Sequence, residues 1–490
     1  MARETDEFIE HYLKALEEGD AALFAGAGLS MPSGFVSWKE LLRDIAQDVG
    51  LDVDRETDLI AVAQYHVNHF RGRARLNRLL LDELARDAKP SKNHQLIASL
   101  PLRAVWTTNY DDLLEQAFRA AGRRPDVKVS VESLATTLPR RDVIIYKMHG
   151  DITQPQDAVL TKDDYEAYAQ KRGLFTDQLK GDLISKTFLF LGFSFTDPNI
   201  DYVLSRIRSL LGQNPREHYC IMRRPQPPDD KGKEPVQYAR EQALYEYERT
   251  RLTLRIDDLR RYGIKALLVD EFGEITTILQ RLNRHSHRKH IFVSGSAHDY
   301  EPLGRDRLEA LARALGQEII RRGYNVVSGV GLGIGGSVVI GALETLYAQD
   351  NGNPDRRTLL RPFPQVTPQG ITKDAFQTKS RRDMIANAGF TLFLSGNKLD
   401  EGTGDVRPGL GVLEEFQLTR EMDRYPIPIG ASGHAARQIW QEVMASLDKF
   451  FPFGGVREHF ETLGKPDSTN EQLVEAVFKI IERTNSARAP

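Results

Sequence analysis

Short apolar runs alternate with longer amphipathic stretches along the first part of the chain. Residues 8–18 carry apolar side chains at helical spacing, and the five apolar residues 21–25 follow them closely. Further apolar runs of strand length predict β-strands, at 104–106, 143–146, 187–191, 218–222 and 265–269. Helical periodicity between them predicts helices, among them 38–49, 58–70, 112–120 and 200–211. Because strands that alternate with helices build parallel sheets covered on both faces, the pattern predicts an α/β fold.

A second α/β pattern begins after a polar break at 285–290. The break holds three histidines, but no carboxylate or cysteine completes a metal-ligand set, so we interpret it as a hydrated linker. Beyond it, strands are expected at 291–293, 324–327 and 391–394, and helices at 308–322, 337–347 and 411–422. The sequence therefore predicts two α/β domains, 1–284 and 285–490.

One segment of the first domain departs from the alternation. Residues 223–237 are rich in proline and charge, and a long charged helix is expected after them, at about 238–261. We interpret the segment as an excursion over the surface.

Composition excludes several classes of partner and of metal site. The formal net charge is −3, so nothing attracts the chain as a whole to nucleic acid or to an anionic membrane, and we expect neither partner. The single cysteine, Cys220, excludes a disulfide framework and a four-cysteine zinc site, and its apolar neighbours predict a buried strand position. The first ten residues have no apolar core, and the longest apolar run, 188–195, is too short to cross a bilayer. These features predict a cytoplasmic protein.

The strand at 21–25 runs directly into the turn Gly26-Ala27-Gly28. Glycines at a strand end let the backbone approach a phosphate, whose charge the start of the following helix favours. The third glycine of the usual fingerprint is absent, because position 31 is Met31. Taken alone, the turn is as compatible with an ordinary tight turn as with a phosphate site.

The longer string at 26–34 resembles the signature of the sirtuins. Two more of their motifs follow in the same order: the stretch 107–111 resembles the asparagine–aspartate motif, and 147–151 resembles the catalytic histidine motif. The stretch 192–194 resembles the later Gly-x-Ser. The resemblance implies a Rossmann-type parallel sheet and two catalytic residues, Asn109 and His149. It also implies a set of NAD-binding residues: Gly26, Ala27, Gly28, Ser30, Asp111, Gly192 and Ser194.

These residue types suit cleavage of the nicotinamide–ribose bond. The leaving group is already a cation, so no general acid is needed, unlike ordinary glycosidases with their two carboxylates. His149 can accept a proton from a ribose hydroxyl, Asn109 can orient a water, and Asp111 can bind the carboxamide or orient Asn109. A purely structural role remains possible for each residue. Residues 108–111 could serve only as a helix cap, and His149 could be a hydrogen-bonded histidine at the end of a strand.

The chain also departs from the deacylating sirtuins. These carry a four-cysteine zinc module, which one cysteine cannot supply, and after Gly34 the usual Pro-x-Phe-Arg is replaced by Val36-Ser37-Trp38. Both differences favour water over acetyl-lysine as the acceptor, and no metal is expected. Protein deacylation remains as an alternative.

The second domain has a glycine loop of its own, Gly331 to Gly336, which follows a strand and opens a helix. No clear acidic partner lies about twenty residues further on, so the loop indicates a phosphate site without specifying a dinucleotide. The domain resembles the SLOG fold, which is related to the Lonely Guy phosphoribohydrolases. Gly409, Gly411 and Glu415 align with their nucleotide motif, whereas Val412 replaces its threonine.

Over its whole length the chain resembles the effectors of Thoeris anti-phage defence, notably in 190–199 and 381–385. The resemblance implies an NAD⁺ hydrolase that a cyclic ADP-ribose isomer activates, the signal coming from a TIR-domain enzyme. It also implies a homotetramer or a higher assembly. It implies an activator site made of these residues: Ser294, Gly295, Ser296, Gly331, Gly333, Arg381, Lys398 and Glu415. A third hypothesis is a non-catalytic nucleotide sensor that acts as a scaffold.

Overall fold

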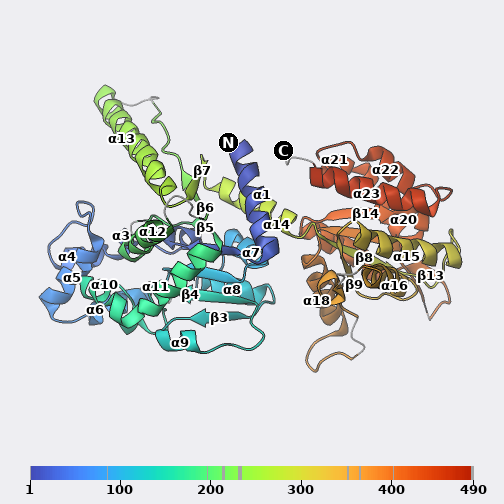
Figure 1. The fold of residues 1–490 in the computed structure, drawn as a ribbon, viewed down its shortest axis with the longest axis horizontal. Helices are drawn as coiled ribbons and strands as arrows, with labels where there is room; N and C mark the ends of the chain where they lie inside the picture. Colours follow the sequence, from blue (N-terminus) through green and yellow to red (C-terminus); the bar gives the residue numbers. More distant parts are fainter. Residues whose placement is uncertain are drawn as a thin grey trace. The chain divides into compact units, whose positions relative to one another are not determined.

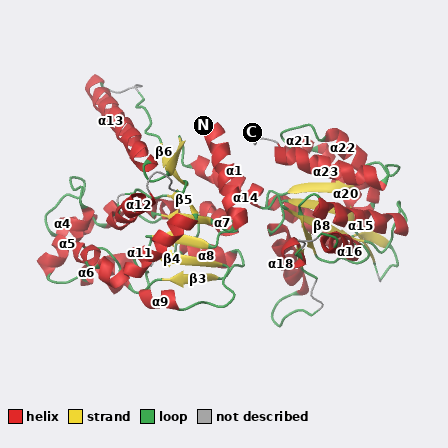
Figure 2. Ribbon diagram, in the orientation of Figure 1, coloured by secondary structure: helices red, strands yellow, loops and turns green. Residues whose placement is uncertain are grey.

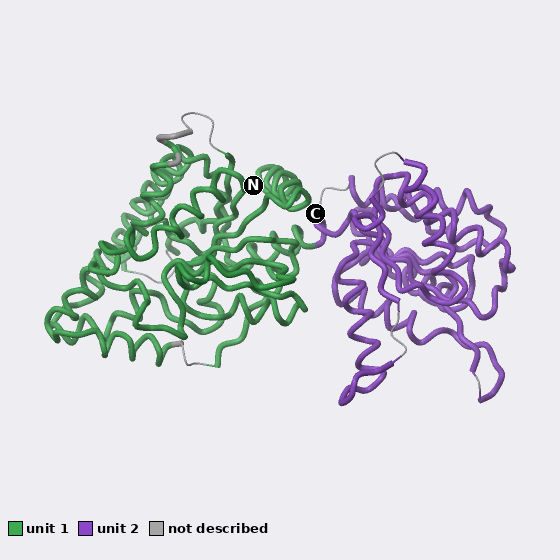
Figure 3. The backbone as a smooth tube through the Cα atoms, turned by 60° about the horizontal axis from the view of Figure 1, so that its bottom comes forward, with its two compact units in different colours: residues 1–283 green, residues 284–490 purple. Residues whose placement is uncertain are grey.

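The computed structural model describes residues 2–84, 87–195, 197–211, 216–229, 234–349, 353–362, 366–400 and 402–486. The chain divides into two compact units, Met1–Asn283 and Arg284–Pro490 (Figure 3). Each unit has its own hydrophobic core and is described by itself.

A seven-stranded parallel sheet forms the centre of unit 1 (Figure 1). Its order is β3-β4-β2-β1-β5-β6-β7. The strands are β1 (Ala21–Ala25), β2 (Ala104–Thr107), β3 (Pro125–Lys128), β4 (Val143–Lys147), β5 (Thr187–Leu191), β6 (His218–Arg223) and β7 (Ile264–Val269). Successive side chains of a strand point to opposite faces of a sheet. In β1, Leu23 therefore packs into the core on one face and Phe24 into the core on the other. The α/β class predicted from the apolar runs is confirmed.

Helices cover both faces of this sheet, and one further helix, α13, extends away from it (Figure 1). They are α1 (Ala2–Glu18), α2 (Ala27–Ser30), α3 (Trp38–Leu41), α4 (Arg43–Asp48), α5 (Leu59–Phe70), α6 (Ala74–Leu84), α7 (Lys92–Ser99), α8 (Leu113–Ala120), α9 (Val131–Ala135), α10 (Lys162–Glu166), α11 (Tyr168–Ser185), α12 (Pro198–Leu211), α13 (Pro235–Arg260) and α14 (Gly273–Ser286). The short 3₁₀ turns Met31–Ser33 and Pro155–Asp157 complete the set.

The register of the sheet brings several strand ends to one edge. Ala25 at the end of β1 pairs with Thr107 of β2 and with Leu191 of β5, and Thr107 pairs with Lys147 of β4. The loops that follow these four strands therefore start side by side, as expected at the carboxyl edge of an open parallel sheet.

Unit 2 is built on a five-stranded parallel sheet of order β10-β9-β8-β11-β14 (Figure 2). The strands are β8 (His290–Ser296), β9 (Asn325–Ser328), β10 (Thr358–Leu360), β11 (Phe390–Ser395) and β14 (Tyr425–Ile429); β12 (Asn397–Leu399) and β13 (Val406–Pro408) form a separate antiparallel hairpin. The helices are α15 (Arg305–Arg321), α16 (Gly335–Tyr347), α17 (Pro354–Arg357), α18 (Lys373–Ala386), α19 (Leu410–Glu421), α20 (His434–Ala445), α21 (Leu447–Phe450), α22 (Arg457–Leu463) and α23 (Asn470–Ser486).

The predicted hydrated linker at 285–290 is wrong. Helix α14 continues through Ser286, strand β8 begins at His290, and both Ser286 and His287 are buried. Polar residue types predicted exposure, but these side chains belong to the last turn of an amphipathic helix and the turn after it. The described residues hold no cluster of three potential metal-ligating side chains.

Two other features bear on the sequence-based expectations. The helix expected at 38–49 is broken at Leu42, which lies between α3 and α4. Within the part of the chain that the structure describes, no helix combines the length and the apolar character that crossing a membrane requires.

Candidate functional site

The glycine turn after β1 packs directly on the loop after β5. The backbone N–H of Gly26 donates to Leu191 O at 2.9 Å, and that of Gly28 donates to Gly192 O at 3.0 Å. A Cβ at Gly26 would lie 2.4 Å from Gly192 O, and one at Gly28 would lie 2.9 Å from Gly192 Cα. Only glycine allows this approach of two backbones, so the two loops form one glycine-lined rim at the edge of the sheet.

Asn109, Ser30 and Asp111 form a connected hydrogen-bond network beneath this rim. Asn109 Nδ2 donates to Gly26 O at 3.1 Å and to Ser30 Oγ at 3.0 Å. Ser30 Oγ in turn donates to Asp111 Oδ2 at 2.8 Å. Because both of these bonds use the amide nitrogen, they fix the orientation of the Asn109 side chain. Its Oδ1 is then the atom that can accept from a water or a hydroxyl.

Thr107 sets the backbone of this network in place. Its Oγ1 donates to Ala25 O at 3.0 Å and accepts from the backbone N–H of Asn109 at 2.9 Å. Burial raises the pKa of Asp111, although its hydrogen bond from Ser30 and the charge of Lys147 oppose that rise. Ser30 thus links Asp111 to Asn109.

Lys147, the last residue of β4, is a fully buried cation that joins two loops. Its Nζ donates to Tyr110 O at 3.1 Å and to Asp111 O at 2.6 Å, and it forms ion pairs with Glu115 at 3.1 Å and with Asp151. Burial lowers the pKa of Lys147, but the two carboxylates outweigh it and hold the pKa above its ordinary value. The ammonium therefore fixes the Asn109 loop against the His149 loop.

His149 lies buried two residues after β4, between two tyrosine rings. The ring centroids of Tyr165 and Tyr168 are 5.6 and 6.2 Å from that of the imidazole, both edge-on. Its Nε2 lies 3.1 Å from Asp197 Oδ2. The backbone O of His149 accepts from Val159 N at 2.9 Å.

Asp197 is the partner of His149 that sequence reasoning did not assign. Its Oδ1 accepts from the backbone N–H of Asn199 at 2.9 Å and of Ile200 at 3.3 Å, and so caps α12. Tyr165 donates to its Oδ2 at 3.3 Å. Burial raises the pKa of Asp197, but the attraction to His149 and these hydrogen bonds hold the pKa below its ordinary value. The sequence signal that could have identified Asp197 is its position as the cap of a helix, in the loop directly after a strand.

The predicted residues of unit 1 gather at the same edge of the sheet. Ser30, Asn109, Asp111 and His149 are buried or half-buried there, whereas Ala27, Gly28, Gly192 and Ser194 are exposed along the rim. Ser194 O accepts a hydrogen bond from Arg255 of α13. The arrangement can hold a phosphate-containing ligand on backbone N–H groups above a fixed amide and an imidazole.

In unit 2 the loop Gly329–Gly336 also packs backbone to backbone. A Cβ at Gly331 would lie 2.2 Å from Gly295 O, and one at Gly333, whose φ is +76°, would lie 2.7 Å from Ala297 O. Leu332 between them is 75% exposed. The loop leads into α16, so its N–H groups and the helix start suit an anion.

Arg381, Glu414 and Glu415 lie together beside this region as paired charges. Arg381 donates to Glu414 at 2.7 Å, and its Nε is 3.6 Å from Glu415 Oε1. Ser294 donates to Glu415, and a Cβ at Gly411 would lie 2.6 Å from the Arg381 guanidinium. Burial raises the pKa of Glu415 to about 7.

Lys398 is placed differently from Arg381 and Glu415. It is exposed on β12, opposite Arg407 of β13 in the hairpin register. Its neighbour Asn397 is buried, and Asn397 Oδ1 accepts from the backbone N–H groups of His298 and Asp299 at 2.8 and 2.9 Å. Asn397 O accepts from Ser296 at 3.1 Å. Asn397, which was not predicted, thus fixes the loop after β8 to the loop after β11.

Two protein families match the chain. A SIR2-like domain family matches residues 103–247, and the Sir2- and TIR-associating SLOG family matches residues 274–484. The chain is 42% identical to the NAD(+) hydrolase ThsA of Bacillus cereus (strain MSX-D12) over 97% of both chains. It is 39% identical to the NAD(+) hydrolase ThsA of Cytobacillus dafuensis over 100% of this chain and 98% of that one. Defense-associated sirtuin 2 of Bacillus subtilis is 25% identical over 45% of this chain and 22% of its own length.

Proposed function

The chain belongs to the ThsA family of NAD(+) hydrolases, and from that premise we propose that it hydrolyses NAD⁺ in unit 1 under the control of unit 2. The bond broken joins the nicotinamide nitrogen to the ribose carbon, and a bond from that carbon to the oxygen of water replaces it. The products are nicotinamide, ADP-ribose and a proton. We infer that this depletion of NAD⁺ serves Thoeris anti-phage defence.

One observation carries the proposal: the network Asn109–Ser30–Asp111 at the carboxyl edge of the sheet. A fixed amide whose oxygen is left to accept suits the orientation of an attacking water. The glycine rim formed by Gly26, Ala27, Gly28 and Gly192 lets the pyrophosphate approach the backbone, and Ser194 extends it towards the adenosine. The N–H groups of Gly26 and Gly28 hold the rim together, so those of Ala27 and Gly192 are the ones we assign to the phosphates.

His149 accepts a proton from a ribose hydroxyl as positive charge develops on the sugar. Its Nε2 lies 3.1 Å from Asp197 Oδ2, so this carboxylate orients the imidazole. Asp197 is thus a positioning residue for His149. Water is the acceptor, because one cysteine cannot build the zinc module of the deacylating sirtuins.

Unit 2 binds the activator, a cyclic ADP-ribose isomer made by a TIR-domain enzyme. We place its pyrophosphate on Arg381 and Lys398, and a ribose or base hydroxyl on Glu415. The backbone around Ser294–Ser296 and the loop with Gly331 and Gly333 supply the remaining cradle. The active form is a homotetramer or a higher assembly.

The catalytic assignment is tested by NAD⁺ consumption. Purified wild type, Asn109→Ala and His149→Ala are compared with and without the cyclic nucleotide, and His69→Ala, exposed on α5, is the matched control. We expect turnover in the wild type and the control only. Activity that survives in both site variants would refute the assignment, whereas O-acyl-ADP-ribose formed only with an acyl-lysine peptide would indicate deacylation.

Gating is tested separately with Arg381→Ala. Its neighbour Arg382, also on α18, forms an exposed ion pair with Glu421 of α19, so Arg382→Ala is the matched control. Arg381→Ala is expected to lose the response to the activator and the control to keep it. A normal response of Arg381→Ala contradicts the activator site, and tight binding to both units without any turnover would favour the scaffold hypothesis.

A further inference from the structure

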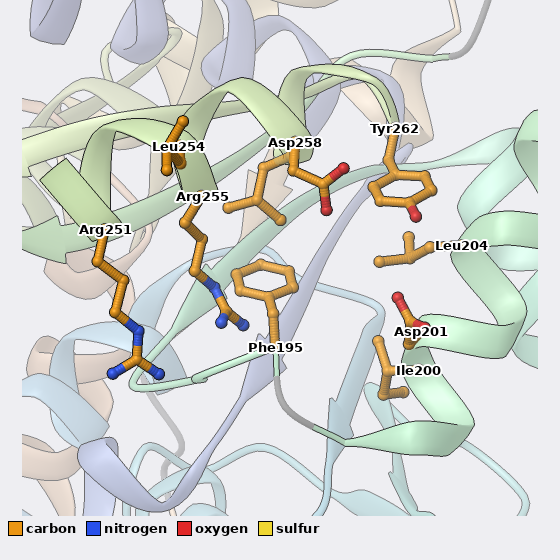
Figure 4. A pocket seen from close by; sticks show the side chains of 10 residues that line it. Phe195, Ile200, Asp201, Leu204, Arg251, Leu254, Arg255, Asp258 and Tyr262 are labelled. Carbon is orange, nitrogen blue, oxygen red and sulfur yellow. The ribbon is translucent and has the colours of Figure 1, made fainter.

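A cavity of about 320 Å³ lies between helices α12 and α13 of unit 1, next to the glycine rim (Figure 4). Phe195, from the loop after β5, lines it on one side, and Arg251 and Arg255 of α13 line it on the other. Arg255 donates a hydrogen bond to Ser194 O, and Ser194 lies two residues beyond Gly192 of the rim. The cavity therefore begins where the rim ends.

The two arginines carry positive charge that no carboxylate neutralises. They lie four residues apart, so their side chains leave the same face of α13. Within the described part of the chain, neither guanidinium forms an ion pair, and the one hydrogen bond of Arg255 goes to a neutral carbonyl. Burial and the nearby charge of Arg251 lower the pKa of Arg255. An anion bound between the two guanidinium groups would stabilise both of them.

The carboxylates that line the cavity lie away from this pair. Figure 4 shows Asp201 and Asp258 on the side of Tyr262. Asp258 forms its ion pair with Arg261, at 2.5 Å. Both aspartates still attract Arg255, but the pKa of Arg255 remains below its ordinary value, so this attraction does not offset burial and repulsion. The end of the cavity beside the rim is therefore the positive end.

The strand order determines which half of NAD⁺ would reach this positive end. Asn109 follows β2 and His149 follows β4, and both strands lie on the same side of β1. Strands β5 and β6 lie on the other side of β1, where Ser194 follows β5 and Arg255 lies near Cys220 of β6. A dinucleotide with its nicotinamide ribose at the two catalytic residues therefore crosses the rim and brings its adenosine to Ser194.

We propose that Arg251 and Arg255 bind a phosphate on the adenosine ribose, so that NADP⁺ is a second substrate of unit 1. In NAD⁺ this ribose carries only hydroxyl groups, which bring no counter-charge to the two arginines. A nearby arginine is what accommodates the 2′-phosphate in dinucleotide sites, and its planar fork donates two hydrogen bonds to phosphate oxygens.

The phosphate takes no part in the bond change. As with NAD⁺, the bond between the nicotinamide nitrogen and the ribose carbon breaks, and a bond from that carbon to the oxygen of water replaces it. The products are nicotinamide, 2′-phospho-ADP-ribose and a proton. The arginines therefore act as specificity-determining residues, at the end of the dinucleotide opposite to the bond that breaks.

The inference deepens the proposed function and rests on it, so binding and turnover are measured separately. Isothermal titration of the full chain compares AMP with adenosine 2′,5′-bisphosphate and adenosine 3′,5′-bisphosphate. We expect the 2′,5′-bisphosphate to bind about 10- to 100-fold more tightly than AMP, as hydrogen bonds to a charged group allow. Arg251→Gln is expected to lose this preference. Arg249→Gln, exposed on the same helix and outside the cavity, is the matched control and should keep it.

Two binding results would overturn the inference. Equal affinity of the wild type for AMP and for the 2′,5′-bisphosphate would show that the arginines hold no phosphate there. Tighter binding of the 3′,5′-bisphosphate would place the phosphate on the other hydroxyl and exclude NADP⁺ as the dinucleotide recognised.

Turnover separates the inference from the proposed function. The ratio of kcat/KM for NADP⁺ to that for NAD⁺ is measured with each cyclic ADP-ribose isomer in turn. We expect Arg251→Gln to lower this ratio about 10- to 100-fold and Arg249→Gln to keep it. Consumption of NAD⁺ without NADP⁺ would refute the second substrate and leave the proposed function standing. Consumption of neither would contradict the proposed function, while the titration still decides whether the arginines bind a phosphate.

Discussion

The candidate sites of the two units differ in how their polar side chains are satisfied before any ligand binds. In unit 1, Asn109, Ser30 and Asp111 hydrogen-bond to one another and to the backbone, and the buried Lys147 fixes the loops that carry them. In unit 2, Arg381 is neutralised by Glu414 and lies beside Glu415. Both sites have a tightly packed glycine loop, so the contrast lies in the charged groups.

This difference separates a preorganised site from one that must rearrange. A fixed amide and imidazole suit chemistry, because little reorganisation is needed at the moment of reaction. Under the proposed function, Arg381 would exchange its carboxylate partner for a phosphate of the activator, and such an exchange of partners is what a ligand-driven switch requires. Four tests sharpen or break this comparison, in order of decreasing effect.

The largest effect is expected for Lys147→Met. The substitution leaves Glu115 and Asp151 buried without their counter-charge, at a cost of about 3–5 kcal/mol in the free energy of unfolding of unit 1. Lys180→Met, which breaks the more exposed pair with Asp177, should cost below about 1 kcal/mol. Urea unfolding followed by tryptophan fluorescence measures the loss of stability in both variants. Equal losses would show that Lys147 stabilises unit 1 no more than an exposed ion pair does.

The next largest effect is expected for Glu415→Gln, which should change how the free energy of unfolding of unit 2 depends on pH. Burial raises the pKa of Glu415 from 4.5 to about 7, so its proton binds more tightly in the folded state. The stability that this proton contributes is complete below pH 4.5 and is lost as the pH rises to 7, in total about 3 kcal/mol.

Glu415→Gln should remove this dependence of the free energy of unfolding on pH. Between pH 5 and pH 8, unit 2 of the variant should therefore lose less stability than unit 2 of the wild type. The groups facing the carboxyl are Ser294, Arg381 and Glu414, and none of them is altered by the substitution. Denaturant unfolding at pH 5 and pH 8 gives the difference, and identical slopes in the two proteins would mean that Glu415 is already ionised.

A smaller effect is expected for Asp197→Asn, measured as turnover. Asparagine keeps the cap of α12 but loses the charge that faces His149, so kcat should fall about 10²-fold with little change in KM. Asp201→Asn, exposed on the same helix, should keep the wild-type kcat. Higher basal activity in Asp197→Asn would instead identify the carboxylate as a block on the imidazole.

The smallest effect compares two glycines, one at each site. In Gly28→Ala the new Cβ would lie 2.9 Å from Gly192 Cα, which is backbone, and should cost about 1–3 kcal/mol. Gly336→Ala meets nothing within 4 Å in the first turn of α16, and should stabilise unit 2 by about 0.5–1 kcal/mol. Thermal unfolding tests both, and a loss at Gly336 would contradict the open surroundings described here.

Local patterns were enough to predict the strands that carry the candidate sites. β1, β2, β4 and β5 are short apolar runs, and the glycine turn after β1 is visible in the sequence. β14 was missed because Pro426 and Pro428 interrupt its pattern, and prolines are tolerated there only since it lies at the edge of the sheet.

The partners of the candidate catalytic residues could not be predicted in the same way. Asp197 and His149 follow strands that are not neighbours, so their contact depends on the order of the whole sheet. The structural role of Lys147 was not predicted, because lysine is usually a surface residue. Only the folded chain shows the carbonyl and carboxylate oxygens that surround its ammonium group.

The hydrogen bond from Arg255 to Ser194 O connects the rim of unit 1 to the long helix α13. Binding equilibria that share a structural element are linked, and the linkage is reciprocal. If a contact made by α13 tightens the binding of NAD⁺ at the rim by some factor, then NAD⁺ tightens that contact by the same factor. Such a contact would weaken as the NAD⁺ pool is spent.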